Sequence, residues 1–334
     1  MVDAVIVGGG LSGLTLCAQL ATTWADRRVL LVDDGRHDVS TRSWACWTRE
    51  PGPLGPPPAH TWDRIGVHAA GSSSIHPLQP YCYATVCGAS LNAVAHERIS
   101  RLRMFEVMAG SVERVRDLGT HAAVSIDGAE VTADWVFDSR PATPSTGPVM
   151  SFLGWEVVAD SDAFDPGVAT FMDFRGRPPG RVAFCYLLPT TSRHALVETV
   201  QVRWDDDAVD LQDSLTGYLS DVCGLPSWAV RRTEAGSLPL LRPRPAGGGR
   251  RVVPIGRRGG MLKPSTGFAL GRILRHTAAI SASLAAQGTP TPCRHPIAVI
   301  RGWTASCSTS FTGSPTWSRS SSTGCSRATA RRPC

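Results

Sequence analysis

The sequence predicts an α/β fold in which a Rossmann-like domain, discontinuous along the chain, carries an inserted domain rich in β-sheet. Three observations support this prediction. Residues 4–7 are apolar and run into glycines at 8–13 and then into a helical pattern. Two long apolar segments lie within residues 181–202, and residues 252–286 repeat the succession of strand, glycine-rich loop and helix. The first pattern is typical of a βαβ unit, and the long segments are typical of strands.

The glycines near the start of the chain are spaced G-x-G-x-x-G, which is the fingerprint of a dinucleotide-binding turn. We expect Gly8 to form the tight turn, Gly10 to let a pyrophosphate approach the backbone, and Gly13 to let the helix pack closely on the strand. The helix N-terminal amides would then face the phosphates. Residues 28–32 predict a second strand that ends at Asp33, about twenty residues beyond the glycines, where a carboxylate binds a ribose hydroxyl. The alternative is a glycine-rich turn without a ligand.

The composition excludes several classes of protein. The 334 residues suffice for one large or two medium domains, and no run of about 18 apolar residues predicts a transmembrane helix. The chain enters a strand without a basic or hydrophobic leader, so we expect a cytoplasmic protein. The ten cysteines have no paired C-x-x-C spacing, and neither a metal site nor a disulfide framework is expected. Nucleic-acid binding is not indicated, because the net charge of +6 is concentrated in residues 301–334.

The end of the chain departs from this pattern. From residue 301 onward it contains nine serines, six threonines, three cysteines, five arginines and no acid, without a helical or strand period. Residues 296–334 therefore form an atypical basic tail. A disordered tail is one interpretation. A shift of reading frame in GC-rich coding sequence is the other, and the tryptophans and cysteines of the tail favour it.

The expected elements alternate between strands and helices along the chain. The first half predicts a polar and aromatic loop at 41–47, a proline-rich connector at 51–58, a helix around 91–102, and strands at 122–126 and 135–137. The second of these strands ends at Asp138, where a chain returning to a nucleotide fold often passes the cofactor. The second half predicts strands at 181–188 and 195–202 joined by a hairpin loop, a helix N-capped by residues 205–207 with an apolar stripe, and a linker at 242–250. The stripe consists of Leu211, Leu215, Leu219 and Val222.

The glycine-rich loop at 256–267 follows a short strand at 252–255 and opens an amphipathic helix at 268–286. Thr266 and Gly267 stand at the opening of that helix, so its N-terminus could also face a cofactor. Two nucleotide-facing loops, one near each end of the chain, predict a flavoprotein. We expect the cofactor domain to comprise residues 1–75, 88–150 and 250–290, and the substrate domain to comprise residues 76–87 and 151–249.

Glu198 is the strongest candidate for chemistry. Strand alternation places Leu196, Glu198 and Val200 on one face, so the carboxyl lies among apolar neighbours. A desolvated glutamate has a raised pKa and keeps its proton near neutral pH, as a general acid requires. The alternatives are a solvent-exposed glutamate on an edge strand and a glutamate paired with Arg193 or Arg203.

Two further acids are candidates of the second rank. Asp173 and Arg175 are spaced to form an ion pair, which either supports a site or is purely structural. Glu234 could supply a second carboxylate, or it is an ordinary loop acid. The ten tryptophans could line an apolar cavity and stabilise a cation through their faces, although most are expected in the core.

The motifs together resemble the lycopene beta-cyclase family of the bacterial carotenoid pathway, flavoproteins in the wider glutathione reductase and aromatic hydroxylase structural group. They occur in the order of that family and span residues 1 to about 290. The glycine fingerprint is generic, whereas the group around Asp173, Pro189 and Glu198 is distinctive. The matching segments are residues 5–13, 42–47, 137–140, 153–155, 171–175, 184–189, 196–199, 234–239 and 259–268.

The resemblance implies an FAD-binding domain, FAD in its reduced form, NAD(P)H as the reductant, and no net redox change. It implies lycopene, drawn from the membrane, as the substrate of a peripheral protein at the inner face of the cell membrane. An acid protonates the terminal double bond, the neighbouring double bond attacks the cation, and loss of a proton leaves a β-ring. The essential glutamate of the family corresponds to Glu198.

Several residues are expected to form the site. The expected catalytic residues are Glu198, Asp173 and Glu234. The expected cofactor-binding residues are Gly8, Gly10, Gly13, Asp33, Arg42, Asp138, Gly256, Gly259, Thr266 and Gly267. The expected substrate-pocket residues are Trp44, Trp155, Phe184 and Tyr186.

The chain departs from the family pattern at two places. Cys82 stands where the family tends to have a basic residue, and after Pro296 the chain lacks the family's helices with Trp-Leu-Asp and Phe-rich patterns. Two alternatives remain open. One is a flavin-dependent hydroxylase or prenyl reductase on the same scaffold, and the other is a catalytically inactive flavin- or carotenoid-binding protein. Cyclisation of one or both ends of lycopene, NADH or NADPH as reductant, and the oligomeric state are also left open.

Overall fold

The computed structural model describes residues 1–49, 58–140, 147–176, 182–204, 210–240 and 249–291. Residues 1–294 belong to one compact unit. The expected basic tail at 296–334, the N-cap at 205–207 and most of the connector at 51–58 and the linker at 242–250 lie outside the described residues. Among the helices of the described part, none combines the length and apolar character needed to span a membrane.

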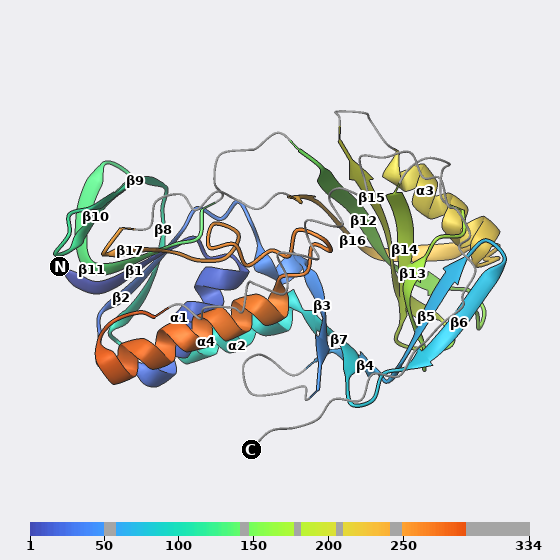
Figure 1. Cartoon of the computed structure of the whole chain (residues 1–334), viewed down its shortest axis with the longest axis horizontal. Helices are drawn as coiled ribbons and strands as arrows, with labels where there is room; N and C mark the ends of the chain where they lie inside the picture. The colour runs from blue at the N-terminus through green and yellow to red at the C-terminus, as the bar shows by residue number, and fades with distance from the viewer. Residues whose placement is uncertain (50–57, 141–146, 177–181, 205–209, 241–248, 292–334) are drawn as a thin grey trace, which may run out of the picture. The chain divides into compact units, whose positions relative to one another are not determined.

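The first sheet has seven strands and is built around β1, in the order β8-β2-β1-β11-β10-β9, with β17 beside β11 (Figure 1). The pairs of β1 with β2 and β11, of β2 with β8, and of β11 with β17 are parallel, whereas β9 and β10 extend the sheet in antiparallel fashion. The bounds are β1 Val2–Val7, β2 Val29–Asp33, β8 Phe105–Ala109, β9 Val112–Asp117, β10 Ala122–Ile126, β11 Ala129–Asp138 and β17 Val252–Pro254.

Three helices cover one face of this sheet: α1 (Leu11–Thr23), α2 (Gly88–Ser100) and α4 (Leu270–Gln287) (Figure 1). Alternation along β1 explains the arrangement, because Ala4 and Ile6 join the core beneath the helices while Val5 and Val7 join the core on the opposite face. The parallel strands and covering helices form the predicted Rossmann-like domain, with α4 returning from the far end of the chain to pack beside α1.

The second sheet also has seven strands, in the order β16-β12-β15-β14-β13-β5-β6. The helix α3 (Leu211–Gly217) and the following π-helix (Tyr218–Val222) pack on one face of it, with Leu215 and Leu219 fully buried. Asp210 caps α3 through bonds from the amides of Gln212 and Asp213. The bounds are β5 Arg64–Ala69, β6 Ser72–Pro77, β12 Val149–Ala159, β13 Ala169–Asp173, β14 Val182–Pro189, β15 His194–Arg203 and β16 Trp228–Pro239.

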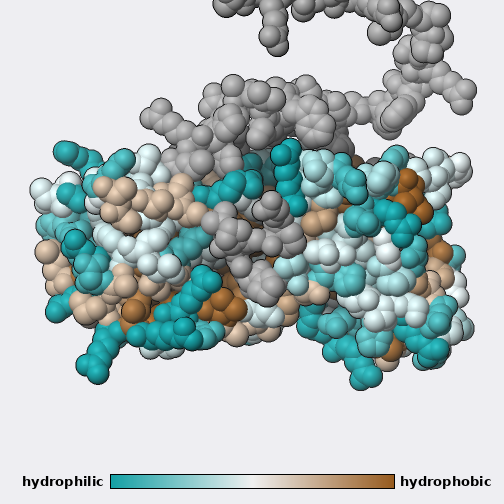
Figure 2. All heavy atoms as spheres, turned by 90° about the horizontal axis from the view of Figure 1, so that it is seen from below, coloured by the Kyte–Doolittle hydropathy of each residue, from teal (hydrophilic) through white to brown (hydrophobic). Residues whose placement is uncertain are grey.

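A three-stranded sheet in the order β3-β7-β4 completes the described fold. Its strands are β3 (Ser43–Thr48), β4 (His60–Trp62) and β7 (Cys82–Cys87), and a short 3-10 helix (Val39–Thr41) precedes it. The surface seen in Figure 2 mixes hydrophilic and hydrophobic residues, and its apolar residues lie in small separate patches.

Some expectations about the elements are confirmed and others are wrong. The hairpin of β14 and β15, the strands β10 and β11 and the helices α2 and α4 are confirmed within a few residues. The predicted loop at 41–47 is largely strand β3, because its aromatic residues pair with β7. Residues 64–77 were expected in the first domain, but β5 pairs with β13 and so belongs to the second sheet. Strand β16, twelve residues long, was not predicted.

Candidate functional site

The turn between β1 and α1 has the geometry of an anion-binding loop. Gly8 has φ of +92° and donates its amide to the Val32 carbonyl over 2.8 Å. A Cβ on Gly13 would lie 1.9 Å from the Gly8 carbonyl oxygen, so only glycine permits this approach of helix to strand. At Gly10, which N-caps α1 without a side-chain bond, a Cβ would meet nothing within 4 Å. The amides of the first turn of α1 are therefore open to a ligand.

Two polar groups at the same turn are available to a ligand. The Ser12 hydroxyl oxygen is buried at the start of α1 and has no hydrogen-bond partner among the described residues. Asp33, at the end of β2, accepts a bond of 2.9 Å from the Gly9 amide through one carboxylate oxygen and lines the same cavity. This arrangement suits a dinucleotide with phosphates at the helix and a ribose at the carboxylate.

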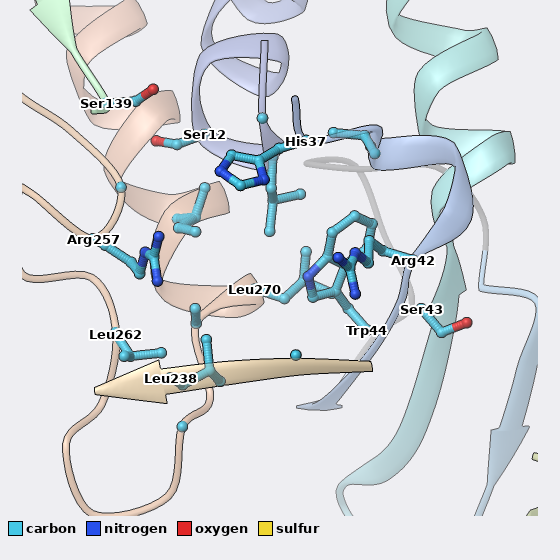
Figure 3. Close-up of a pocket in the computed structure, with 18 of the residues that line it drawn as sticks. Ser12, His37, Arg42, Ser43, Trp44, Ser139, Leu238, Arg257, Leu262 and Leu270 are labelled. Atoms are coloured by element: carbon cyan, nitrogen blue, oxygen red, sulfur yellow. The ribbon is translucent and has the colours of Figure 1, made fainter. Parts of the chain in front are cut away.

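The second glycine-rich loop lies against the first. A Cβ on Gly256 would stand 3.0 Å from the Ser12 Cβ, and Gly256 has φ of +58°. The Thr266 hydroxyl is buried without a partner in the described part of the chain, and Gly267 has φ of +73°. Figure 3 shows Ser12 and Ser139 on one side of the pocket with Arg257 and Leu262 of this loop nearby.

One cavity of about 900 Å³ joins both glycine loops to the second sheet. Its wall contains backbone and side chains from β1, α1, β3, β7, β14, β15 and β16. The structure brings eleven of the expected site residues to this cavity: Gly8, Gly10, Asp33, Arg42, Trp44, Tyr186, Glu198, Glu234, Gly256, Thr266 and Gly267.

Six expected site residues do not line the cavity: Gly13, Asp138, Trp155, Asp173, Phe184 and Gly259. A Cβ on Gly259 would lie 2.6 Å from the Pro254 carbonyl oxygen, so a glycine is needed here for the close packing of the loop on its own backbone. Trp155 packs in the core beneath α3, on the face away from the cavity. Phe184 lies behind Tyr186, with ring centroids 5.2 Å apart.

Asp138 and Asp173 are both buried ion-pair partners in D-x-R sequences. Asp138 is 1% exposed and accepts bonds of 3.0 Å from the Nε and Nη2 of Arg140. Asp173 is 0% exposed and accepts bonds of 3.0 Å from Arg175 Nε and 2.9 Å from the Tyr218 hydroxyl. Burial alone would raise the pKa of Asp173, but hydrogen bonds from Arg175 and Tyr218 hold it below its usual value. Both carboxylates thus lie in buried ion pairs within the fold, outside the cavity lining.

Glu198 has the opposite environment. Its side chain is partly buried on β15 and its carboxyl faces the cavity beside Leu196 and Val200. Within the described ranges, no hydrogen bond or ion pair reaches this carboxyl. Loss of water around it, and then repulsion from Glu234, raise its pKa from 4.5 to about 8. This direction favours the protonated form of Glu198 near neutral pH.

The contacts of Glu198 differ from both alternatives, a pair with Arg193 or Arg203 and an exposed position on an edge strand. Arg193 pairs with Asp162, with Nε and Oδ1 2.7 Å apart, at the exposed end of the hairpin. Arg203 donates to the Ser151 hydroxyl over 3.2 Å. Glu198 also lies in the interior of the sheet, since β15 has β12 on one side and β14 on the other.

Glu234 is a strand residue rather than a loop acid. It lies on β16, and its side chain is 4% exposed. Its Oε2 accepts a bond of 2.9 Å from Arg232 Nη1 and another of 2.9 Å from the Ser43 amide. These donors compensate a negative charge, so Glu234 and Glu198 have contrasting environments on the same wall of the cavity.

Sequence reasoning missed Arg232 and the role of Gly154. Arg232 precedes Glu234 by two residues, which places both on one face of a strand. That signal was hidden because β16 contains three charged residues, a glycine and a proline and was not identified as a strand. The sequence places Gly154 in a motif with Trp155, but the position of Gly154 between two carboxylates depends on pairing between strands distant in sequence.

Comparisons with solved structures identify the fold. A geranylgeranyl bacteriochlorophyll reductase-like protein from Thermoplasma acidophilum superposes with a TM-score of 0.64 at 13% identity, over 85% of this chain and 78% of that chain. An HpxO variant from Klebsiella pneumoniae, complexed with FAD, gives 0.60 at 15% identity over 91% and 85%. The p-nitrophenol 4-monooxygenase PnpA from Pseudomonas putida gives 0.59 at 13% identity over 93% and 88%.

Sequence comparison adds the family. No curated protein matches the chain. The family model described as "Lycopene cyclase protein" matches residues 3–312, nearly the whole length. The fold of the FAD-dependent reductases and monooxygenases, the cavity that joins the glycine loops to Glu198, and this match agree with one another. The chain belongs to the lycopene cyclase family.

Proposed function

We propose that the protein is a lycopene beta-cyclase, which isomerises the acyclic end groups of lycopene to β-rings with FAD bound and with no net redox change. The observation that carries the proposal is the Glu198 carboxyl, which faces the cavity without a hydrogen-bond partner among the described residues. The cavity continues from Glu198 to the two glycine loops, so an acid and a flavin site share one space.

The residues of the two loops fit FAD. The open amides of α1 and the Ser12 hydroxyl suit the pyrophosphate, Asp33 suits a ribose, and the unpartnered Thr266 hydroxyl suits a polar edge of the flavin. Reduced FAD supplies an electron-rich ring system that stabilises positive charge in a neighbouring substrate. NAD(P)H, as the reductant, is part of the same proposal.

Glu198 performs the acid step. At neutral pH its proton is held in an apolar space and is delivered to the terminal double bond of the polyene. The neighbouring double bond attacks the resulting tertiary cation and closes the ring, and loss of a different proton from a carbon beside the new cation leaves the ring double bond. The faces of Tyr83, Tyr186 and Phe268 on the cavity wall stabilise the cation, and the apolar wall excludes water that would capture it.

Incubation of the FAD-loaded protein with lycopene and NADPH under anaerobic conditions tests the proposal. A cyclic product of the same mass as lycopene supports it. A product that gains two hydrogens indicates a prenyl reductase, and an added oxygen, seen when air is admitted, indicates a hydroxylase. Expression in lycopene-accumulating cells separates both from an inactive binding protein, for which soluble, FAD-loaded protein leaves the pigment unchanged.

Peripheral contact with the inner face of the cell membrane is proposed as the source of this apolar substrate. Trp47, on β3, is 37% exposed, Tyr81, directly before β7, is 44% exposed, and the Arg49 guanidinium lies 4.9 Å from the Tyr81 ring. Exposed tryptophan, tyrosine and arginine side chains suit the interface of a bilayer. Co-sedimentation with anionic lipid vesicles tests this contact, and Trp47→Ala combined with Tyr81→Ala is expected to reduce it.

A further inference from the structure

Four residues form one row across neighbouring strands of the second sheet. Tyr186 on β14 is opposite Glu198 on β15, Glu198 is opposite Gly154 on β12, and Gly154 is opposite Glu234 on β16. A Cβ on Gly154 would lie 3.2 Å from Glu234 Cγ and 3.5 Å from Glu198 Oε2. The two carboxylic side chains therefore converge over a residue that has no side chain of its own.

Arg232 fixes one of these two acids. Its Nη1 donates to Glu234 over 2.9 Å and to the Thr41 carbonyl over 3.0 Å, and its Nη2 donates to the Ser43 hydroxyl over 2.8 Å. The Ser43 amide adds a further bond to the same Glu234 oxygen. Donors to Glu234 thus come from β16 and from the start of β3, whereas none of the described residues donates to Glu198.

We infer that Arg232 and Glu234 act as a positioning pair for Glu198: Arg232 and the Ser43 amide hold the Glu234 carboxylate beside Gly154, and across Gly154 this carboxylate adds to the effect of burial in keeping the proton on Glu198. The inference rests on the proposed function of Glu198 as the acid. It makes Glu234 a charged neighbour rather than a second proton donor. It also explains why a glycine stands between the two, since any side chain there would separate them.

The other ionisable groups near Glu198 do not supply a competing charge. Tyr186 and Tyr83 face the same space from β14 and β7, and burial raises the pKa of both hydroxyls, so they remain neutral. Cys185, adjacent on β14, also has a pKa raised by burial. Among the described residues, Glu234 is the group whose repulsion raises the pKa of Glu198, so its removal has a predictable sign: Glu198 loses its proton at lower pH.

The test is an infrared titration of the FAD-loaded protein without lycopene, which follows the C=O band of protonated carboxyl groups. Glu198→Gln identifies the Glu198 band. In Glu234→Gln, which keeps the size of the side chain, we expect the midpoint of that band to move to lower pH by about one unit. Glu156→Gln is the matched control. Glu156 also accepts a hydrogen bond from Arg232, over 3.1 Å, but it is half exposed and is not opposite Gly154. In this control the midpoint of the Glu198 band should not move.

Substitution of the arginine tests the other half of the pair. In Arg232→Met, Glu234 loses its counter-charge, so a second protonated carboxyl band should appear near neutral pH. Arg232→Lys should suppress that band. An unchanged midpoint in Glu234→Gln, or no second band in Arg232→Met, would show that the pair is only a strut between β16 and β3. If the wild-type protein cyclises lycopene but Glu234→Gln does not shift the midpoint of the Glu198 band, only this inference is overturned. If the midpoint shifts but the wild-type protein does not cyclise lycopene, only the proposed function is overturned.

Discussion

Asp173 and Glu198 are both predicted from the sequence as catalytic acids, yet the environments of their carboxyl groups are opposite. They lie on β13 and β15 of the same sheet, separated only by β14. Asp173 is closed off by Arg175 and by Tyr218 of the covering helix, and its pKa is lowered. Glu198 faces the cavity with no donor in the described part of the chain, and its pKa is raised. The donors, rather than burial itself, decide what each acid can do.

The largest effect is expected at the acid without partners. Glu198→Gln removes the transferable proton and keeps the shape of the side chain, so cyclisation should fall by a factor of about 10³. Binding of FAD, read from the flavin absorbance of the purified protein, should not change, because Glu198 lies away from the glycine loops on β15. Retention of wild-type turnover would remove Glu198 as the proton donor.

The second effect is expected at the acid with partners. Asp173→Asn leaves Arg175 and Tyr218 without their shared carboxylate, so the free energy of unfolding in urea should fall by about 2–3 kcal/mol. Asp162→Asn is the control, because its pair with Arg193 is exposed and should contribute below about 1 kcal/mol. A stable Asp173→Asn protein with much reduced turnover would instead give Asp173 the catalytic role that the sequence suggested.

The sequence predicted the geometry around the first glycine loop better than the geometry around Glu198. Gly8, Gly10 and Asp33 are local: one turn and the end of the next strand place them, and spacing alone identifies them. The alternation along β15 also predicted which face carries Glu198. The convergence of Glu198 and Glu234 depends on β12 pairing with both β15 and β16, which are about thirty residues apart along the chain.

Contacts between distant segments also explain what the sequence left open. The D-x-R spacing predicts the ion pair of Asp173 with Arg175 but gives no sign of Tyr218, which comes from a helix forty-five residues later. Residues 41–47 resembled a loop because their partner strand, β7, follows a long connector. Local sequence patterns predict turns and the faces of strands, whereas contacts between distant segments are known only from the three-dimensional structure.

A third prediction concerns the pH dependence of stability. Between about pH 4.5 and pH 8 the folded protein keeps the Glu198 proton that the unfolded chain has already lost, so this group lowers stability progressively as pH rises through that range. Glu198→Gln lacks this dependence. Its free energy of unfolding relative to wild type should therefore increase from pH 5 to pH 8, by about 3 kcal/mol. A difference that is constant across that range would mean that Glu198 is ionised as an ordinary glutamate.

The smallest effect is expected at the spacer between the two acids. Gly154→Ala adds a Cβ at 3.2 Å from Glu234 Cγ, which the side chains can accommodate by small shifts, so stability should change by less than about 1 kcal/mol. The two carboxyl groups should separate, and turnover should fall several-fold through kcat rather than KM. Gly217→Ala, at the end of α3 and outside the cavity, is the control for an added methyl group, because a Cβ there would meet only Asp221 Oδ2, at 3.9 Å. Equal kcat values in Gly154→Ala and wild type would show that the spacing does not matter.

The proton itself provides the most direct test of acid-initiated cyclisation at Glu198. The proton delivered to the terminal double bond stays on the ring, and a different proton is lost from a neighbouring carbon. In D2O the product of the wild-type protein should therefore carry one deuterium for each ring formed, and Glu198→Gln should form no labelled product above background. A cyclic product without deuterium, or equal labelled product from the variant, would contradict the account.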